Sequence, residues 1–257
     1  MKKTVLYIFL IAVFTGCATT KTKPHQETPA QAELEKALLS IKYGLVERSI
    51  TFSKEAINLD PRMIEAYNTL GYAYMTLRNF NDAIYTFNRC IEINPNYSEA
   101  YNNLGVCYKE IGKEFEAESS FKKAIAIDSN PNSAINLAEI YFKKGDYDSS
   151  LEYLENALIK NPISAQALND KALIYIQKGR TEEAIALHKQ ALLQLPQDLN
   201  LQFNLAEAYF RNSDFQLSKG ILLRIKPQAK SEELKNKIES LLKLLDREYS
   251  GPFLPLG

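Results

Sequence analysis

The sequence predicts an all-α chain folded as a right-handed superhelical solenoid of about six helix hairpins. When the chain is aligned in rows of 34 residues, each row repeats a tyrosine with a small residue three positions before it. Further along the row come a small residue, a bulky residue and a second small residue, at the spacing of one helix face. A fixed period of this length indicates helix pairs that bury their apolar faces by stacking on one another.

Each row assigns residues to columns on two helices. The first helix carries Tyr74, Tyr108, Tyr141, Tyr175 and Tyr209, preceded by Gly71, Gly105, Ala138, Ala172 and Ala206. The second helix carries Ala83, Ala117, Ser150, Ala184 and Ser218, then Phe87, Phe121, Leu154, His188 and Leu222, then Cys90, Ala124, Ala157 and Ala191. Small residues let neighbouring helix axes approach to about 8–10 Å, and the larger side chains fill the gaps between them.

These columns resemble the tetratricopeptide repeat. Units close with a proline, at Pro61, Pro95, Pro162 and Pro196, because proline ends the second helix. The resemblance covers roughly residues 30–227 as six units, and the first is degenerate because Ser40 replaces its tyrosine. Turns inside the hairpins are expected at Asn79-Phe80, Gly112, Gly145-Asp146, Gly179-Arg180 and Ser213-Asp214. The 67 residues from Pro95 to Pro162 are one short of two repeats, and Ser129 replaces a proline, which predicts an irregular join between the third and fourth units.

The first 16 residues read as a targeting segment. Lys2 and Lys3 precede an apolar run, Val5 to Phe14, that is too short to span a bilayer. The following Thr15-Gly16-Cys17 resembles a bacterial lipoprotein box, which implies cleavage before Cys17 and its lipidation with acyl chains such as palmitate. The alternative is an ordinary secretory signal with an incidental cysteine. By the same resemblance, Ala18 after the cysteine favours the periplasmic face of the outer membrane in the bacterial cell envelope.

The domain organisation follows from these segments. We expect a signal peptide at residues 1–16, lipidated Cys17 with a flexible tether at 17–30, the solenoid at 31–230, a capping helix at 231–248 and a tail at 249–257. The tether lacks apolar periodicity. Lys226-Pro227 shortens the last hairpin, and the helix after it carries apolar residues on one face that would cover the open end of the core.

Composition disfavours several classes of function. The chain has 31 Lys and Arg against 31 Asp and Glu, so no nucleic-acid partner is expected. The sequence shows no catalytic arrangement, metal-ligand cluster or phosphate loop, so we expect neither an enzyme nor a cofactor, metal or small-molecule substrate. Cys90 and Cys107 read as core thiols, with a disulfide as the alternative, and His188 lies in a packing column.

One face of the first helices is predicted to form a concave peptide-binding groove. Its apolar residues are Tyr72, Met75, Val106, Phe142, Leu173, Ile176, Phe203 and Phe210, interleaved with Asn68, Asn102, Asn103, Asn136, Asn169 and Asn204. An asparagine side chain can donate to and accept from an extended peptide backbone, while apolar residues form pockets for its side chains. The bland alternative is that individual asparagines satisfy neighbouring helices and some aromatic residues belong to the core.

The expected function is a membrane-anchored scaffold that binds a segment of another envelope protein. The acyl anchor supplies the contact with the lipid membrane. Six such repeats on a lipoprotein resemble the type IV pilus biogenesis lipoproteins, which implies a pilotin-like factor for secretin assembly. The alternative is a regulatory adaptor that docks cell-wall synthases or hydrolases on its outer surface.

Overall fold

The computed structural model describes residues 28–248. Within them the chain forms six helix hairpins followed by a short 3-10 turn and a final helix. The helices are α1 (Pro29–Lys42), α2 (Val46–Leu59), α3 (Ile64–Thr76), α4 (Phe80–Ile93), α5 (Ser98–Glu110), α6 (Glu114–Asp128), α7 (Pro131–Lys143), α8 (Tyr147–Lys160), α9 (Ala165–Gln177), α10 (Thr181–Gln194), α11 (Leu199–Arg211), α12 (Phe215–Ile225) and α13 (Glu232–Glu248). The all-α solenoid of six hairpins with a capping helix is therefore confirmed.

The first helix begins slightly earlier than predicted. Thr28 caps α1 by accepting from Gln31, whose side chain accepts from the Thr28 backbone in return, and Pro29 occupies the first helical turn. The last two residues of the predicted tether are thus helical. Residues 17–27 of the tether, including Cys17, the signal segment and the tail 249–257 lie outside the described residues.

The turns inside the hairpins use a left-handed residue at one column. Gly44, Gly112, Gly145 and Gly179 have positive φ there, and so do Arg78 (φ 58°) and Ser213 (φ 64°). The prediction for the second hairpin was one residue off, because Arg78 and not Asn79 adopts the left-handed conformation. The 34-residue register therefore determines the turn even where glycine is absent.

The predicted irregular join lies between α6 and α7. Other hairpins are joined by four-residue turns such as residues 94–97, where the Tyr97 N–H donates to the Asn94 carbonyl at 3.1 Å. Here Ser129 instead turns the chain at once, with a left-handed φ of 57°. Asn130 then caps α7 by accepting from Ser133. The Glu118 carboxylate holds the join together, since it accepts from the Tyr141 hydroxyl and from Lys144 at 2.9 Å each.

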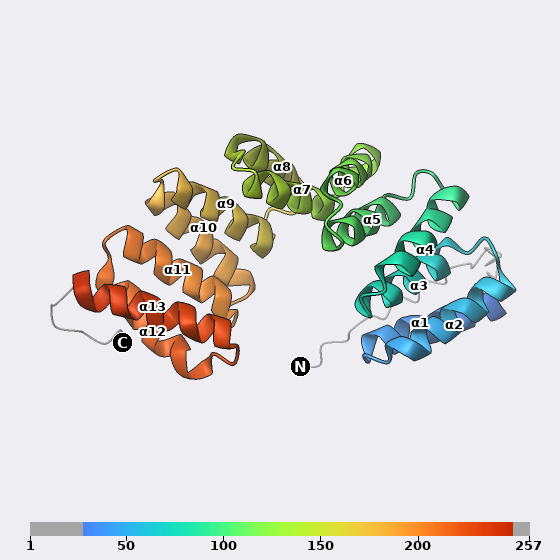
Figure 1. Cartoon of the computed structure of the whole chain (residues 1–257), viewed down its shortest axis with the longest axis horizontal. Coiled ribbons are helices and arrows are strands. Elements are labelled where there is room, and N and C mark those ends of the chain that lie inside the picture. The colour runs from blue at the N-terminus through green and yellow to red at the C-terminus, as the bar shows by residue number, and fades with distance from the viewer. Residues whose placement is uncertain (1–27, 249–257) are drawn as a thin grey trace, which may run out of the picture.

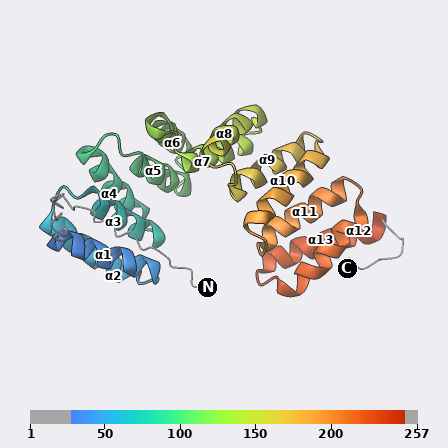
Figure 2. The same ribbon diagram turned by 180° about the vertical axis from the view of Figure 1, so that it is seen from behind.

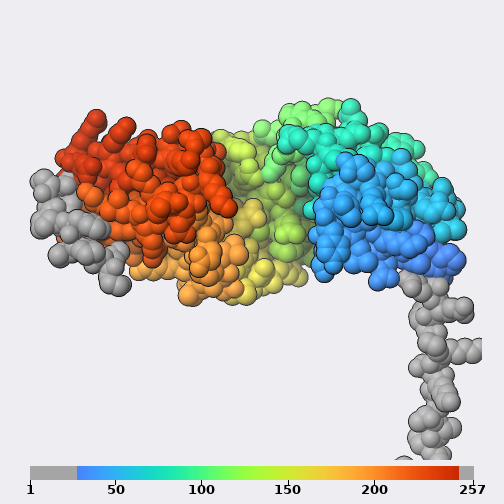
Figure 3. Space-filling view, turned by 90° about the horizontal axis from the view of Figure 1, so that it is seen from below, coloured from blue at the N-terminus to red at the C-terminus, as the bar shows by residue number. Residues whose placement is uncertain are grey.

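The hairpins stack into an arch (Figures 1 and 2). Helices α6 to α8 lie at its top, and its two limbs end in α1 and α2 on one side and in α11 to α13 on the other. Successive odd-numbered helices contact one another, whereas even-numbered helices contact mainly the odd-numbered helices beside them. The odd-numbered helices therefore form the concave surface. Figure 3 looks into the hollow between the two limbs.

The repeated columns form the core. The Phe87 and Phe121 rings, Leu154, His188 and Leu222 are fully buried, as are the small residues that precede them on each second helix. Buried clusters join each hairpin from α3–α4 onward to the next, and Leu234, Ile238, Leu241 and Leu245 of α13 complete the last one. Among residues 28–248, no helix is both long and apolar enough to cross a bilayer.

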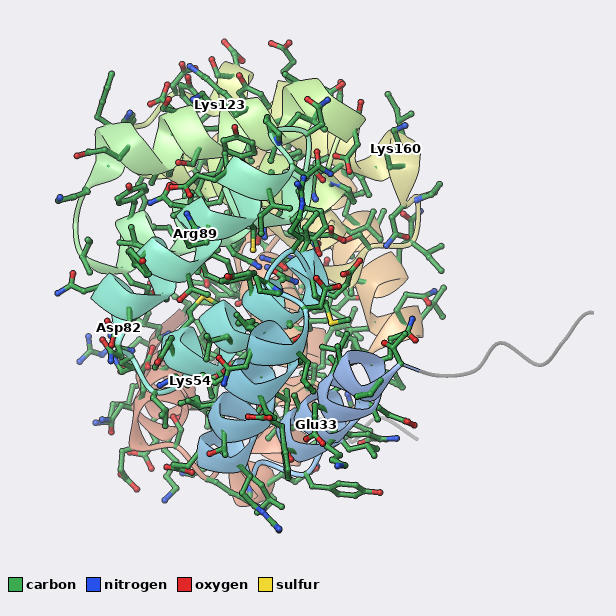
Figure 4. The ribbon with its side chains drawn as sticks, turned by 90° about the vertical axis from the view of Figure 1, so that its right-hand side faces the viewer. Glu33, Lys54, Asp82, Arg89, Lys123 and Lys160 are labelled. Atoms are coloured by element: carbon green, nitrogen blue, oxygen red, sulfur yellow. The ribbon has the colours of Figure 1, made fainter. Side chains whose placement is uncertain are left out.

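The exposed side chains of the even-numbered helices, on the convex surface, include charged, neutral and apolar groups. Figure 4 views the array from its N-terminal hairpins and labels Lys54 on α2, Arg89 on α4 and Lys123 on α6 at successive units. Some large apolar side chains are also exposed on even-numbered helices, with Phe115 at 83% and Leu193 at 78% exposure. The convex surface therefore presents exposed apolar groups as well as charged ones.

Candidate functional site

Two columns of the odd-numbered helices supply the concave surface. Relative to the repeated tyrosine, they lie two positions before it and one position after it. The earlier column holds Tyr72, Val106, Glu139, Leu173 and Glu207, and the later one holds Met75, Lys109, Phe142, Ile176 and Phe210. Because their spacing of three residues places both columns on one helix face, side chains of adjacent units can form shared pockets.

The first pocket lies between α7 and α9. It has a volume of about 340 Å³. Ala138 and Phe142 of α7 and Leu173 and Ile174 of α9 give it an apolar lining, while Glu139, Lys143, Ser150, Gln166 and Asp170 supply polar groups. Phe142 is held in place by a tilted contact with the Tyr147 ring, at 5.6 Å between ring centroids. The predicted groove residues Phe142 and Leu173 are thus brought together.

The two acids of this pocket have different surroundings. Burial alone would raise the pKa of Glu139, but hydrogen bonds from Lys109 (2.7 Å) and Lys143 (2.6 Å) outweigh it and hold that pKa below its usual value. Burial raises the pKa of Asp170 to about 6, and the nearby Glu139 charge adds to the increase, opposed by a hydrogen bond from Asn169 and by Lys109. The pocket therefore contains two carboxylates in different states: Glu139 is ion-paired with two lysines, whereas Asp170 forms no ion pair and is stabilised only weakly, by Asn169 and the charge of Lys109.

A second pocket of about 650 Å³ lies between α11 and α13. Its α11 wall repeats the α7 wall two units later: Glu207, Phe210 and Arg211 stand 68 positions after Glu139, Phe142 and Lys143. The contacts repeat as well. Arg211 pairs with Glu207 as Lys143 pairs with Glu139, and the Phe210 ring contacts Phe215 at 5.7 Å as Phe142 contacts Tyr147. The fourth and sixth units thus present the same wall to the concave surface.

The rest of the second pocket is formed by the capping helix. Glu233, Asn236, Lys237, Ser240, Leu241 and Leu244 of α13 line it opposite Phe203 and Phe210. Here Glu233 pairs with Lys237 at 2.5 Å and Glu207 with Arg211 at 2.8 Å. The α13 helix therefore covers the end of the core and also contributes a wall to the concave surface.

The predicted asparagines lie together, but they are bonded within the array. The Asn103 amide donates to Asn68 of the preceding unit at 3.1 Å, and Asn102 donates to Asn103. Across the irregular join, the Asn102 oxygen accepts from the Ser133 hydroxyl at 2.9 Å and from Asn136 at 3.5 Å. These amides connect consecutive units, as in the alternative that individual asparagines satisfy neighbouring helices.

The amide contacts continue in the C-terminal half. Asn204 donates to Asn169 of the preceding unit at 2.9 Å, and Asn169 donates to the Asp170 carboxylate at 3.1 Å. The Asn136 oxygen accepts from Lys109. Side chains at this level of the concave surface therefore hold neighbouring helices in register, a role that leaves each amide part of its hydrogen-bonding capacity.

The remaining predicted groove residues divide by burial. Tyr72 is 45% exposed on the concave side of α3, and Met75 and Val106 are half-buried in the clusters of the N-terminal units. Ile176 and Phe203 are almost fully buried, so they belong mainly to the core.

The sequence interpretation missed Asp170, Glu139 and Lys143. Asp170 stands five positions before the repeated tyrosine, in the column that holds Asn103, Asn136 and Asn204 in other units. The alignment thus contained the signal, since a carboxylate replaces an amide at one position of the series. Glu139 likewise falls in the column of Tyr72, Val106 and Leu173, from which the apolar groove residues are predicted.

Residues outside the concave surface show no comparable arrangement. Cys90 and Cys107 are buried free thiols, and burial raises the pKa of each to about 12. His188 is fully buried, its two ring nitrogens have no hydrogen-bond partner, and burial lowers its pKa to about 4. In the described part of the chain, no group of three His, Cys, Asp or Glu side chains is placed to hold a metal ion.

Solved structures with the same arrangement of hairpins include proteins of bacterial pilus assembly. PilF of Pseudomonas aeruginosa is 15% identical, with a TM-score of 0.73 over 82% of this chain and 97% of that one. PilW, described as a widely conserved type IV pilus biogenesis factor, is 16% identical, with a TM-score of 0.71 over 83% and 98%. MamA is 25% identical, with a TM-score of 0.52 over 62% and 94%. No curated protein matches the chain.

Family models support the same conclusion from the sequence. Models described as tetratricopeptide repeats match residues 64–97, 86–119, 135–198 and 175–241, which together make up more than half of the chain. Repeats of this kind form scaffolds for interaction with protein or peptide partners. The repeat columns, the stacked hairpins and these matches agree, and the chain belongs to the tetratricopeptide repeat family.

Proposed function

We propose that this protein is a lipid-anchored scaffold of the bacterial envelope that binds an extended segment of another envelope protein along its odd-numbered helices. The observation that carries the proposal is the recurrence of one pocket wall, Glu139-Phe142-Lys143 and Glu207-Phe210-Arg211, on the same face two units apart. An extended chain that crosses the concave surface would place separate side chains in the two pockets.

The finer proposal is a pilotin-like role in assembly of a type IV pilus secretin. It is supported by the lipoprotein-like Thr15-Gly16-Cys17 and by the extent of the fold, since the chain covers nearly all of PilF and PilW. In this role the acyl chains on Cys17 hold the scaffold at the outer membrane while the concave surface carries a segment of the secretin subunit.

Secretin assembly in cells tests this role. We expect that deletion of the gene, or Cys17→Ser, removes heat-resistant secretin multimers from the outer-membrane fraction, and that the Cys17→Ser protein no longer incorporates radiolabelled palmitate. Multimers that assemble normally in the deletion strain would contradict the pilotin-like role. Equal palmitate incorporation by Cys17→Ser would contradict the lipid anchor separately.

The adaptor function is the second candidate, because the convex surface also exposes apolar side chains. Tyr85 on α4, Phe115 on α6, Ile159 on α8 and Leu193 on α10 are each more than two-thirds exposed. These residues would suit a folded cell-wall synthase or hydrolase that docks on the outer surface. Loss of binding to such an enzyme in Phe115→Ser and Leu193→Ser variants, with secretin assembly unaffected, would favour this alternative.

A further inference from the structure

Asp170 differs from the other acids that line the two concave pockets. Glu139, Glu207 and Glu233 each pair with a lysine or arginine within 2.8 Å. Within residues 28–248, the hydrogen bond that the Asp170 carboxylate makes is to a neutral group, the Asn169 amide, at 3.1 Å through one of its oxygens. The carboxylate lies in the α7–α9 pocket. No lysine or arginine of residues 28–248 forms an ion pair with it, because the nearby Lys109 and Lys143 pair with Glu139.

The fold does not require a charge at this position. Other units carry Asn103, Asn136 and Asn204 in the same column, and these amides make the contacts between units. An asparagine at position 170 could accept the same hydrogen bond from Asn169. Because burying a carboxylate without a cation is unfavourable, its charge is explained better by a ligand than by folding.

The shape and lining of the pocket select the ligand. Phe142 and Leu173 line it from α7 and α9, and Asp170 and Gln166 supply oxygen atoms on the α9 side. Lysine and arginine side chains combine an apolar stem with a cationic head, and so fit a pocket with apolar walls and one carboxylate that forms no ion pair. Glu139 does not compete for this cation, since both of its oxygens accept from lysines.

We propose that the α7–α9 pocket binds a basic side chain, lysine or arginine, of the partner segment, with the cationic head on the Asp170 carboxylate and the stem between Phe142 and Leu173. This inference rests on the proposed function, in which the concave surface holds an extended peptide. It assigns a different kind of partner side chain to each pocket. The acids of the α11–α13 pocket are already paired with basic residues, so that pocket is left to an apolar side chain of the partner segment.

Selection from a library of random ten-residue peptides tests the inference. The purified chain, its isosteric Asp170→Asn variant and a matched Asp148→Asn control would each be used as bait. Asp148 lies on α8, outside the pocket, and pairs with Lys178. We expect the wild type and the control to enrich peptides with one basic residue among apolar ones, and Asp170→Asn to lose that enrichment while still selecting apolar peptides.

Titration of one selected peptide then locates the basic residue. Replacing its lysine or arginine by norleucine, which retains the stem, should weaken binding to the wild type at least tenfold and leave binding to Asp170→Asn nearly unchanged. An equal loss with both proteins, or peptides selected without a basic residue, would overturn the inference while peptide binding by the concave surface stands. If no peptide is selected, or binding is the same in Phe142→Ala, the proposed function fails with it.

Discussion

The ring of Phe121 on α6 lies directly against the backbone of Gly105 on α5. A methyl group at Gly105 would stand 2.5 Å from Cε1 of the ring, well inside contact distance, and the same relationship recurs between Gly71 and Phe87 at 2.6 Å. These two hairpins therefore require glycine in the small-residue column, whereas the later hairpins, with Leu154, His188 and Leu222 in place of phenylalanine, carry alanine there.

Gly105→Leu is therefore expected to force the third hairpin apart. Overpacking of this kind costs about 1–3 kcal/mol or more, because the ring is fully buried and has no free space to enter. Urea unfolding monitored by circular dichroism measures the loss. Ser119→Leu, which adds the same side chain on the exposed face of α6, is the control and should change stability little. A stable Gly105→Leu protein would mean that the two helices do not pack in this register.

Asn102→Ala is expected to weaken the join between the third and fourth units. Asn102 accepts from the Ser133 hydroxyl, which is fully buried, so its removal leaves that hydroxyl without this partner at a cost of about 1–3 kcal/mol. Asn132→Ala, on the exposed side of α7, is the matched control. Thermal unfolding should separate the two variants. Equal melting temperatures would show that the amide contact contributes nothing to the stacking.

Asp170→Asn is expected to stabilise the free protein at neutral pH. The folded-state pKa of Asp170, about 6, is above the value of an exposed aspartate, so the carboxyl favours folding below pH 3.8, and this contribution is lost as the pH rises through 6. The free energy of unfolding of the variant should therefore exceed that of the wild type by about 1–3 kcal/mol at pH 8 and equal it near pH 3.5. Glu139, Lys109 and Lys143 surround the group in both proteins, so their titration cancels in the comparison. An Asp170→Asn protein less stable than the wild type at pH 8 would show that the charge serves the fold.

His188→Leu is expected to remove a source of acid sensitivity. The folded pKa of His188 is about 4 against 6.5 when exposed, so the unfolded chain binds a proton more readily and stability falls as the pH drops from 6.5 towards 4. At pH 5 this loss is about 2 kcal/mol. Leucine, which fills the same column at Leu154 and Leu222, should stabilise the protein at pH 7 and more so at pH 5. The reciprocal variant, Leu154→His, should introduce acid sensitivity, and pH-independent differences in either variant would contradict this reading of the buried ring.

The fold could be predicted because the 34-residue columns determine which residues are packed. Small residues at Gly105 and Ala138, bulky ones at Phe121 and Leu154, and turns at Gly112 and Gly145 each follow from the repeat alone. The left-handed turn at Arg78 was predicted one residue late, at Asn79, because asparagine adopts that conformation more readily than arginine, although the 34-residue spacing from Gly112 points to position 78.

The concave surface was predictable only in part. The columns identified Phe142, Leu173 and Phe210, which the structure places in pockets. The position of α13 decides that Phe203 is only 9% exposed, at the wall of the α11–α13 pocket. Contacts between side chains of different units, such as Asn103 with Asn68, depend on the twist of the array and cannot be read from spacing. Asp170 interrupts the series of Asn103, Asn136 and Asn204 with a carboxylate, and this single charge in a column of amides is its more informative residue.

Photo-crosslinking in cells tests the central claim, that the partner lies on the concave surface, most directly. A benzophenone amino acid would replace Leu173, in the α7–α9 pocket, or Leu193, which is 78% exposed on α10 of the convex surface. Crosslinked products would be identified by mass spectrometry after detergent extraction of the envelope. The account predicts one envelope protein crosslinked through a short contiguous segment from position 173 and absent from position 193. Crosslinks to a folded cell-wall enzyme from position 193, with none from position 173, would contradict it.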